Sequence, residues 1–159
     1  MRIRLNIVRQ EKEFVVTDSL TKQKRTEVMA AIHSTGNQAT EMRLVAILRT
    51  HGITGWRRHQ PLPGKPDFVF RREHLAVFVD GCFWHGCRWH CRMPKSRRSY
   101  WEPKIMRNKA RDKAIRGILQ EAGWQVHRIW EHSLDESFSV VAKLKLALHN
   151  ASKQAGRAS

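Results

Sequence analysis

The chain has 159 residues, a length that suits one domain built around a single core. Thirty lysine and arginine side chains face fourteen aspartate and glutamate side chains, so the formal net charge is +16 and the partner we expect is a polyanion, in the first place nucleic acid. Apolar content is ordinary, which argues against disorder, while no apolar run is long enough for a membrane span and the first residues are too polar for a secretory signal.

The first half of the chain predicts two helices followed by short strands, from apolar spacing and from β-branched and aromatic runs. The predicted segments are a flexible arm at residues 1–16, helices at 21–33 and 39–50, and strands at 56–59, 67–70 and 75–79. We expect the second helix to bury Met42, Val45, Ile47 and Leu48. Gly52 fits the C-terminal cap of that helix.

The second half begins with a long loop and continues with two helices and a strand. The predicted segments are a loop at residues 81–99, a basic helix at 100–122, a strand at 124–130 and a helix at 133–149. The basic helix carries Ile105, Ile115, Ile118 and Leu119 on one side, and Gly123 ends it. This order predicts one α/β domain over residues 17–150, with a mixed central sheet flanked by helices, and a flexible tail at 151–159.

The long loop begins with a segment rich in cysteine and histidine, residues 81–91, which we call the Cys/His loop. All three cysteines of the chain, Cys82, Cys87 and Cys91, lie in it. An odd number of closely spaced cysteines argues against disulfides and for metal binding in a reducing cytosol. A structural zinc ion takes four nitrogen or sulfur ligands, so the fourth must be a histidine. The candidates are His85, His90 and His132.

Two acidic residues are expected to meet near the Cys/His loop. Asp67 begins one predicted strand, and Asp80 ends the strand that follows it in a hairpin. Two carboxylates, or one carboxylate and a backbone carbonyl, make the hard oxygen site that Mg²⁺ prefers, where it can polarise a phosphodiester. His85 follows closely and is a candidate general acid or base.

Four stretches of the sequence closely resemble the very-short-patch-repair (Vsr) DNA mismatch endonucleases. They are PGKPDFVF, VFVDGCFWHGC, YWEPKIMRNKARD and LQEAGWQVHRIWEH, within a resemblance that runs from about Asp18 to about His132. The resemblance implies a variant of the PD-(D/E)XK restriction-endonuclease fold with a structural zinc ion. It also implies a bacterial, cytoplasmic, nucleoid-associated enzyme that nicks one strand beside a T:G mismatch, the product of 5-methylcytosine deamination.

The resemblance further implies roles for single residues. Asp67 resembles the central Mg²⁺ ligand, with the Val79 carbonyl as the second. His85 resembles the catalytic histidine, Asp112 the acid that supports it, and Glu41 a helix carboxylate near the metal. Without the resemblance, Asp112 and Glu41 would be ordinary charges on a solvated helix face. The implied zinc ligands are Cys82, Cys87, Cys91 and His132.

Two positions depart from the family pattern. Asp80 stands where a family member has a catalytic histidine, so it could bind the metal itself. The Cys/His loop is two residues longer between its second and third ligands than in that member. This leaves His90 as the alternative to Cys91, with Cys91 favoured.

Aromatic residues form the last group of candidates. By resemblance, Phe83, Trp84 and Trp101 wedge between base pairs, which costs less at a mismatch. Met29 and Ile32 are implied as a second wedge, although their spacing alone fits the core face of a helix equally well. The expected partner is duplex DNA with a T:G mismatch, bound by a monomer, with mismatch-repair proteins as further candidates. The alternatives are a nuclease for fully matched DNA and a zinc-stabilised DNA-binding module without catalysis.

Overall fold

A four-stranded sheet organises the part of the chain that the structure describes, residues 40–94 and 97–155 of a computed structural model. Its strands are β1 (Trp56–Arg57), β2 (Phe68–Phe70), β3 (Leu75–Asp80) and β4 (Gln125–Trp130), in the order β1-β2-β3-β4. The first three are antiparallel, whereas β3 and β4 are parallel. The predicted mixed sheet is therefore confirmed, and all described residues belong to one compact unit, Ile32–Ser159.

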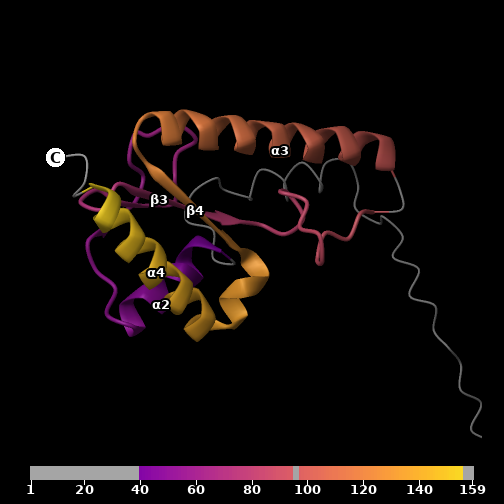
Figure 1. Ribbon diagram of the computed structural model, residues 1–159. Helices are drawn as coiled ribbons and strands as arrows, with labels where there is room; N and C mark the ends of the chain where they lie inside the picture. Colours follow the sequence, from indigo (N-terminus) through magenta and orange to yellow (C-terminus); the bar gives the residue numbers. More distant parts are fainter. Residues whose placement is uncertain (1–39, 95–96, 156–159) are drawn as a thin grey trace, which may run out of the picture. The chain divides into compact units, whose positions relative to one another are not determined.

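Helices cover both faces of this sheet (Figure 1). They are α2 (Glu41–Thr50), α3 (Arg98–Glu121) and α4 (Ser137–Ala155), with a short 3₁₀ helix, η1 (Glu131–Asp135), between β4 and α4. On β3, Leu75 and Val77 pack in one core with α2 and α4, while Ala76 and Phe78 pack in another with Leu119 of α3. Because alternate residues of β3 are buried on opposite faces, the strand is an almost continuous apolar run.

Glycines end two of the helices as predicted. Gly52 and Gly123 have φ angles of 63° and 78°, a left-handed conformation that costs glycine little. After Gly123 the amide of Trp124 bonds the carbonyl of Leu119 at 2.9 Å, which satisfies a carbonyl at the end of α3. The same arrangement follows α2, where the amide of Ile53 bonds the carbonyl of Leu48. None of the described helices is long and apolar enough to cross a membrane.

Some details of the helices differ from the expectation. Ile118, which the apolar spacing placed on the same side of the helix as Leu119, is 51% exposed, whereas Leu119 is fully buried against the sheet with Ile115 packed beside it. Leu44 is fully buried although the apolar spacing did not indicate it. Helix α4 runs to Ala155 and buries Ala151, so it includes the first residues of the expected tail. The predicted arm and first helix, with the wedge residues Met29 and Ile32, lie outside the described residues.

The parallel pairing of β3 and β4 positions the functional site. Asp80 lies opposite Trp130 at the end of both strands, so the two chain segments that follow leave the sheet side by side. One segment is the Cys/His loop and the other is η1, which carries His132. A cluster can therefore form from residues about fifty positions apart in the sequence.

Candidate metal centre and active site

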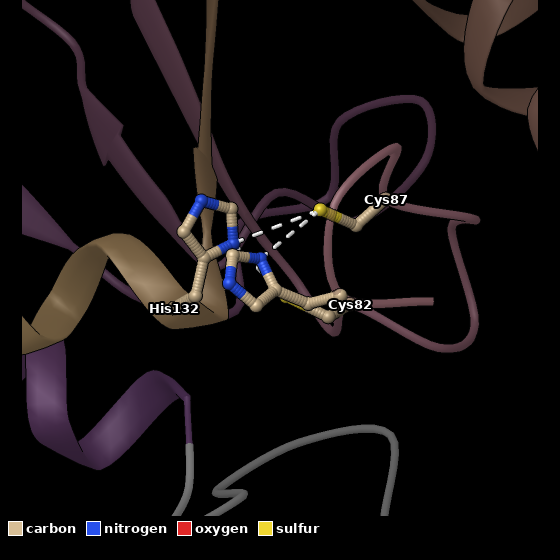
Figure 2. A group of neighbouring side chains, drawn as sticks. Cys82, Cys87 and His132 are labelled. Carbon is tan, nitrogen blue, oxygen red and sulfur yellow. Dashed lines mark hydrogen bonds between the residues drawn. The ribbon is translucent and has the colours of Figure 1, made fainter. Parts of the chain in front are cut away.

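Two cysteines and two histidines converge beside the ends of β3 and β4. The ligand atoms of Cys82, Cys87, His90 and His132 all lie within 4.8 Å of one another. The Nδ1 atom of His132 is 3.1 Å from the Cys82 sulfur and 3.7 Å from the Cys87 sulfur (Figure 2). Zinc bonds of about 2.0–2.3 Å place tetrahedral ligand atoms about 3.3–3.8 Å apart. The donor set and its spacing fit a structural zinc ion.

The fourth member of this group is His90 and not the expected Cys91. The segment from Cys87 makes one helical turn, in which the amide of Cys91 bonds the carbonyl of Cys87 at 3.1 Å. This turn brings Nδ1 of His90 to 3.7 Å from the Cys87 sulfur. The Cys91 thiol instead donates to the carbonyl of Phe83 at 3.6 Å. Residue spacing within the turn thus places His90, and not its neighbour Cys91, beside the other three candidate ligands.

Polar contacts hold the Cys/His loop against the rest of the fold. The amide of Cys82 donates to the Glu131 carboxylate at 3.0 Å, and the Asn108 side chain donates to the carbonyl of Trp84 at 2.8 Å. Gly86 has a φ angle of 62° and lies so close to α3 that a Cβ there would be 2.7 Å from Cγ2 of Ile105. Burial raises the pKa of the Cys82 thiol, so the thiolate form that binds zinc depends on the ion itself.

Asp67 lies at the entrance of β2, where its carboxylate accepts the amide of Val79 at 2.7 Å. The pKa of Asp67 is raised from 3.8 to about 6, chiefly by burial and also by the neighbouring charges of Glu41 and Asp80, against the opposing hydrogen bond from Val79 and the charge of His85. A cation held by Asp67 would remove this penalty. The site therefore has the electrostatic character of a cation site.

The expected second ligand, the Val79 carbonyl, is available for a chemical reason. In a strand, the N–H and C=O of one residue point to the same side, and the amide of Val79 points toward Asp67. Extending the register by two residues from Phe68 opposite Val77 places Pro66 opposite Val79. Proline has no N–H, so the ladder supplies no donor for this carbonyl. Asp67 and Val79 together fit Mg²⁺.

His85 is held by an acid from another element. Its Nδ1 atom lies 2.6 Å from Oδ2 of Asp112, which projects from the middle of α3. With Nδ1 engaged, Nε2 is the nitrogen left to exchange a proton with a substrate or a water molecule. The supporting contact implied for Asp112 is present, and Asp112 is not an ordinary solvated helix charge.

Asp80 is buried and paired. Only 3% of the residue is exposed, and its two oxygens accept from Nε and NH2 of Arg128 at 2.5 and 2.6 Å. Burial lowers the pKa of Arg128, but the hydrogen bonds and charges of Asp80 and Asp112 outweigh burial and raise it above its usual value. We had expected that Asp80 could bind the metal directly. The guanidinium of Arg128 competes with a metal ion for the Asp80 carboxylate, and the sequence did not reveal this pairing.

Glu41 also lies away from solvent. It is 2% exposed at the start of α2, and its carboxylate pairs with Arg58 at 2.5 Å and lies 3.8 Å from Nε2 of His59. The solvated-face interpretation of Glu41 is therefore wrong. Its charge is close enough to raise the pKa of Asp67. Glu41, Asp67, Asp80 and His85 consequently form one cluster, drawn from α2, the two central strands and the Cys/His loop.

Comparison with known proteins shows the family of this chain. Residues 17–91 match the family described as DNA mismatch endonuclease Vsr. The type II nicking enzyme V.XorIIP of Xanthomonas oryzae pv. oryzae is 37% identical over 132 residues, which are 82% of this chain and 96% of that protein. DNA mismatch endonuclease Vsr of Escherichia coli K12 is 37% identical over 122 residues, 75% of this chain and 76% of that protein. The chain belongs to the Vsr family.

The Vsr-family match spans Glu41, Asp67, Asp80 and His85, whereas Asp112 and His132 follow it in the chain. A further relative, the type II nicking enzyme V.NaeI of Lentzea aerocolonigenes, is 46% identical over 86 residues, 54% of this chain and 51% of that protein. The resemblance inferred from the four sequence stretches is therefore confirmed.

The aromatic residues expected at the DNA of a Vsr-family protein form one group. Phe83, Trp84 and Trp101 contact one another edge to face, with ring centroids 5.1–5.9 Å apart. Lys104 lies over the rings of Trp84 and Trp101 at 5.2 and 5.6 Å. A cation on an aromatic group is a surface suited to a nucleic acid, whose bases stack and whose phosphates are anionic.

Basic side chains continue from this aromatic group along α3. Six basic residues of the helix are exposed: Arg98, Arg107, Lys109, Arg111, Lys113 and Arg116. Sequence reasoning found this helix and its charge, but it missed two arginines within the acidic cluster, Arg58 and Arg128. A signal existed for Arg128, because a charged residue in the middle of a strand must meet a partner when it is buried.

Proposed function

We propose that this Vsr-family protein is a Mg²⁺-dependent endonuclease that nicks one DNA strand beside a T:G mismatch and so begins very short patch repair. One observation carries the proposal: a carboxylate with a raised pKa, Asp67, adjoins the Asp112–His85 pair next to a Cys₂His₂ group. A DNA-binding module without catalysis gains nothing from carboxylates that face phosphate. The proposed fold is a PD-(D/E)XK variant with structural zinc at Cys82, Cys87, His90 and His132.

The residues of the chain divide the proposed chemistry between them. Asp67 and the Val79 carbonyl hold the magnesium ion, which when bound polarises the phosphodiester and stabilises its negative charge. His85 takes a proton from the attacking water through Nε2, because Asp112 fixes the ring through Nδ1. The developing imidazolium is stabilised by the Asp112 carboxylate at 2.6 Å.

Substrate binding in this proposal uses charge and stacking. The exposed basic residues of α3 neutralise phosphates, which gives affinity without sequence preference. Phe83, Trp84 and Trp101 enter the base stack, and the mismatch lowers the cost of unstacking. One acidic cluster is enough to cut one strand, so a monomer suffices for nicking.

The decisive experiment compares nicking of a T:G duplex with nicking of the same duplex carrying T:A, each with and without Mg²⁺. We expect cutting of the T:G duplex alone, and only with the metal. Equal cutting of both duplexes would leave a nuclease for matched DNA. DNA binding without any cutting would leave a binding module.

The aromatic group is tested by a matched pair of tryptophan variants. Trp84→Ala is expected to reduce the preference for T:G over T:A by about 10-fold or more, from the lost stacking of one base. The control is Trp89→Ala, since Trp89 is 75% exposed and contacts only the guanidinium of Arg88 among the aromatic interactions of the described residues. Equal preference in both variants and the unmodified protein would contradict a wedge at Trp84.

A further inference from the structure

We propose that Arg128 is a positioning residue that keeps Asp80 out of the metal's ligand set and fixes Asp112 behind His85. The inference rests on the proposed endonuclease function and goes beyond it, because it names the residue that decides which carboxylate is free for the metal.

The guanidinium of Arg128 contacts two acidic side chains, those of Asp80 and Asp112. Its Nε and Nη2 atoms donate hydrogen bonds to the two oxygens of Asp80 at 2.5 and 2.6 Å. The Nη2 atom of Arg128 also lies 3.3 Å from Oδ1 of Asp112, and the other oxygen of Asp112, Oδ2, contacts Nδ1 of His85. A planar guanidinium can make these contacts at once because its donors form a rigid fork.

The position of Arg128 is fixed from every side. It lies in β4 opposite Phe78 in the parallel register, and its guanidinium lies 4.9 Å from the centroid of the Phe78 ring. Phe78 in turn belongs to the core that Leu119 of α3 completes. Only 14% of the Arg128 side chain is exposed. Strand β3, strand β4 and helix α3 therefore meet at one side chain, and Asp112 links it to His85 of the Cys/His loop.

This arrangement has a consequence for metal binding. Asp80 follows Val79, the residue that offers its carbonyl to the cation, and its charge is close enough to raise the pKa of Asp67. If the carboxylates of Asp67 and Asp80 were both free, they would form a larger oxygen site. Such a site could hold one cation more tightly or bind a second cation. Arg128 prevents this by engaging both oxygens of Asp80, so Asp67 is the carboxylate that remains.

The test uses the zinc-loaded protein with Arg128→Met, Asp80→Asn and the double variant. Arg128→Met removes both hydrogen bonds from the buried Asp80 carboxylate, which keeps Nδ1 of His85 at 3.8 Å, and it loosens Asp112, so T:G nicking should fall by about 10- to 100-fold. The double variant removes the orphaned charge as well and should recover part of that loss. Arg43→Met is the control, because Arg43 pairs with an exposed aspartate, Asp135, and its loss removes the same charge.

A second measurement separates positioning from a merely structural role. Binding of Mn²⁺ to each zinc-loaded protein, measured by electron paramagnetic resonance without DNA, should become tighter or gain a second ion in Arg128→Met. The gain should disappear in the double variant. Unchanged Mn²⁺ binding in a folded Arg128→Met protein, or a double variant no more active than Arg128→Met, would overturn the proposal.

Two further outcomes are informative. If Arg128→Met does not fold, Arg128→Lys serves instead, because one ammonium group cannot bind both Asp80 oxygens and Asp112 at once. Nicking and Mn²⁺ binding equal to those of the unmodified protein in Arg128→Lys would also overturn the proposal. Failure of the proposed function looks different, because the unmodified protein would then not nick the T:G duplex at all, whereas the Mn²⁺ comparison would still decide the role of Arg128.

Discussion

The sheet and the Cys/His loop of this Vsr-family protein are stabilised in different ways. The sheet buries apolar side chains on both faces, among them Phe68, Val77 and Leu119. The Cys/His loop has partly exposed aromatic rings and is fixed by the Cys₂His₂ group and by polar contacts to Glu131 and Asn108. The difference predicts that the sheet folds through hydrophobic burial, whereas the conformation of the loop, which carries His85, would depend on the proposed zinc ion.

The largest expected effect concerns the acidic cluster at the boundary between these two regions. Asp67→Asn should lower the rate of T:G nicking by ~10³-fold or more, because the neutral amide cannot replace the carboxylate that holds Mg²⁺. Affinity for the duplex, measured by fluorescence anisotropy, should remain. Asp135→Asn is the matched control, since the Asp135 side chain is 71% exposed and far from the cluster in the chain.

Loss of zinc should affect the Cys/His loop and leave the sheet folded. Cys87→Ala should purify with little zinc and nick the T:G duplex about 100-fold more slowly, because the loop no longer presents His85. Cys91→Ala should keep the metal, since its thiol bonds a backbone carbonyl outside the group. Zinc content by atomic emission and far-ultraviolet circular dichroism are the measurements.

The opposite result for the two cysteines would restore the original expectation that Cys91 is the ligand. A collapse of the sheet signal in Cys87→Ala would contradict the independence of the two regions.

A substitution in the apolar core tests the sheet separately from the Cys/His loop. Leu119→Ala removes a fully buried side chain between α3 and the sheet, so the free energy of unfolding should fall by about 2–5 kcal/mol. Zinc content should stay unchanged. The neighbouring Ile118→Ala, at a position that is 51% exposed, should change the free energy of unfolding far less in the same urea titration.

The smallest effect is a pH dependence at Asp67. Its pKa is about 6 in the folded protein, against an ordinary value of 3.8, so the unfolded chain releases this proton first as pH rises. The stabilisation that the group gives at low pH is lost as pH rises to about 6, in total ~3 kcal/mol before solvent screening. The Mg²⁺-free protein should therefore become less stable relative to Asp67→Asn between about pH 4 and pH 6, with little further change above.

Unfolding of both zinc-loaded proteins by urea at several pH values gives this difference directly. Saturating Mg²⁺ should reduce it, because the cation stabilises the charged carboxylate. A difference that does not vary with pH would show that Asp67 titrates normally.

The sequence alone determined most of the secondary structure and most of the candidate site. Runs such as LAVFV at residues 75–79 predicted strands because they are short, β-branched and aromatic, and a sheet buried on both faces accommodates so continuous an apolar pattern. Gly52 and Gly123 ended helices because they accept left-handed backbone at little cost. Asp67, His85 and the first two cysteines were singled out as candidates by local spacing and chemistry, whereas Asp112 was implied only by the family resemblance.

Only the tertiary structure decided the choices that depend on residues distant in sequence. The helical turn after Cys87 put His90 into the metal group and turned Cys91 away. The parallel register of β3 and β4 brought Arg128 onto Asp80, a pairing across 48 positions that no local pattern contains. The family resemblance had placed Glu41 near the metal, but only the fold showed that it is buried and paired with Arg58. Partners of a buried charge are set by packing, because the charge must be paired with whichever opposite group the fold brings near.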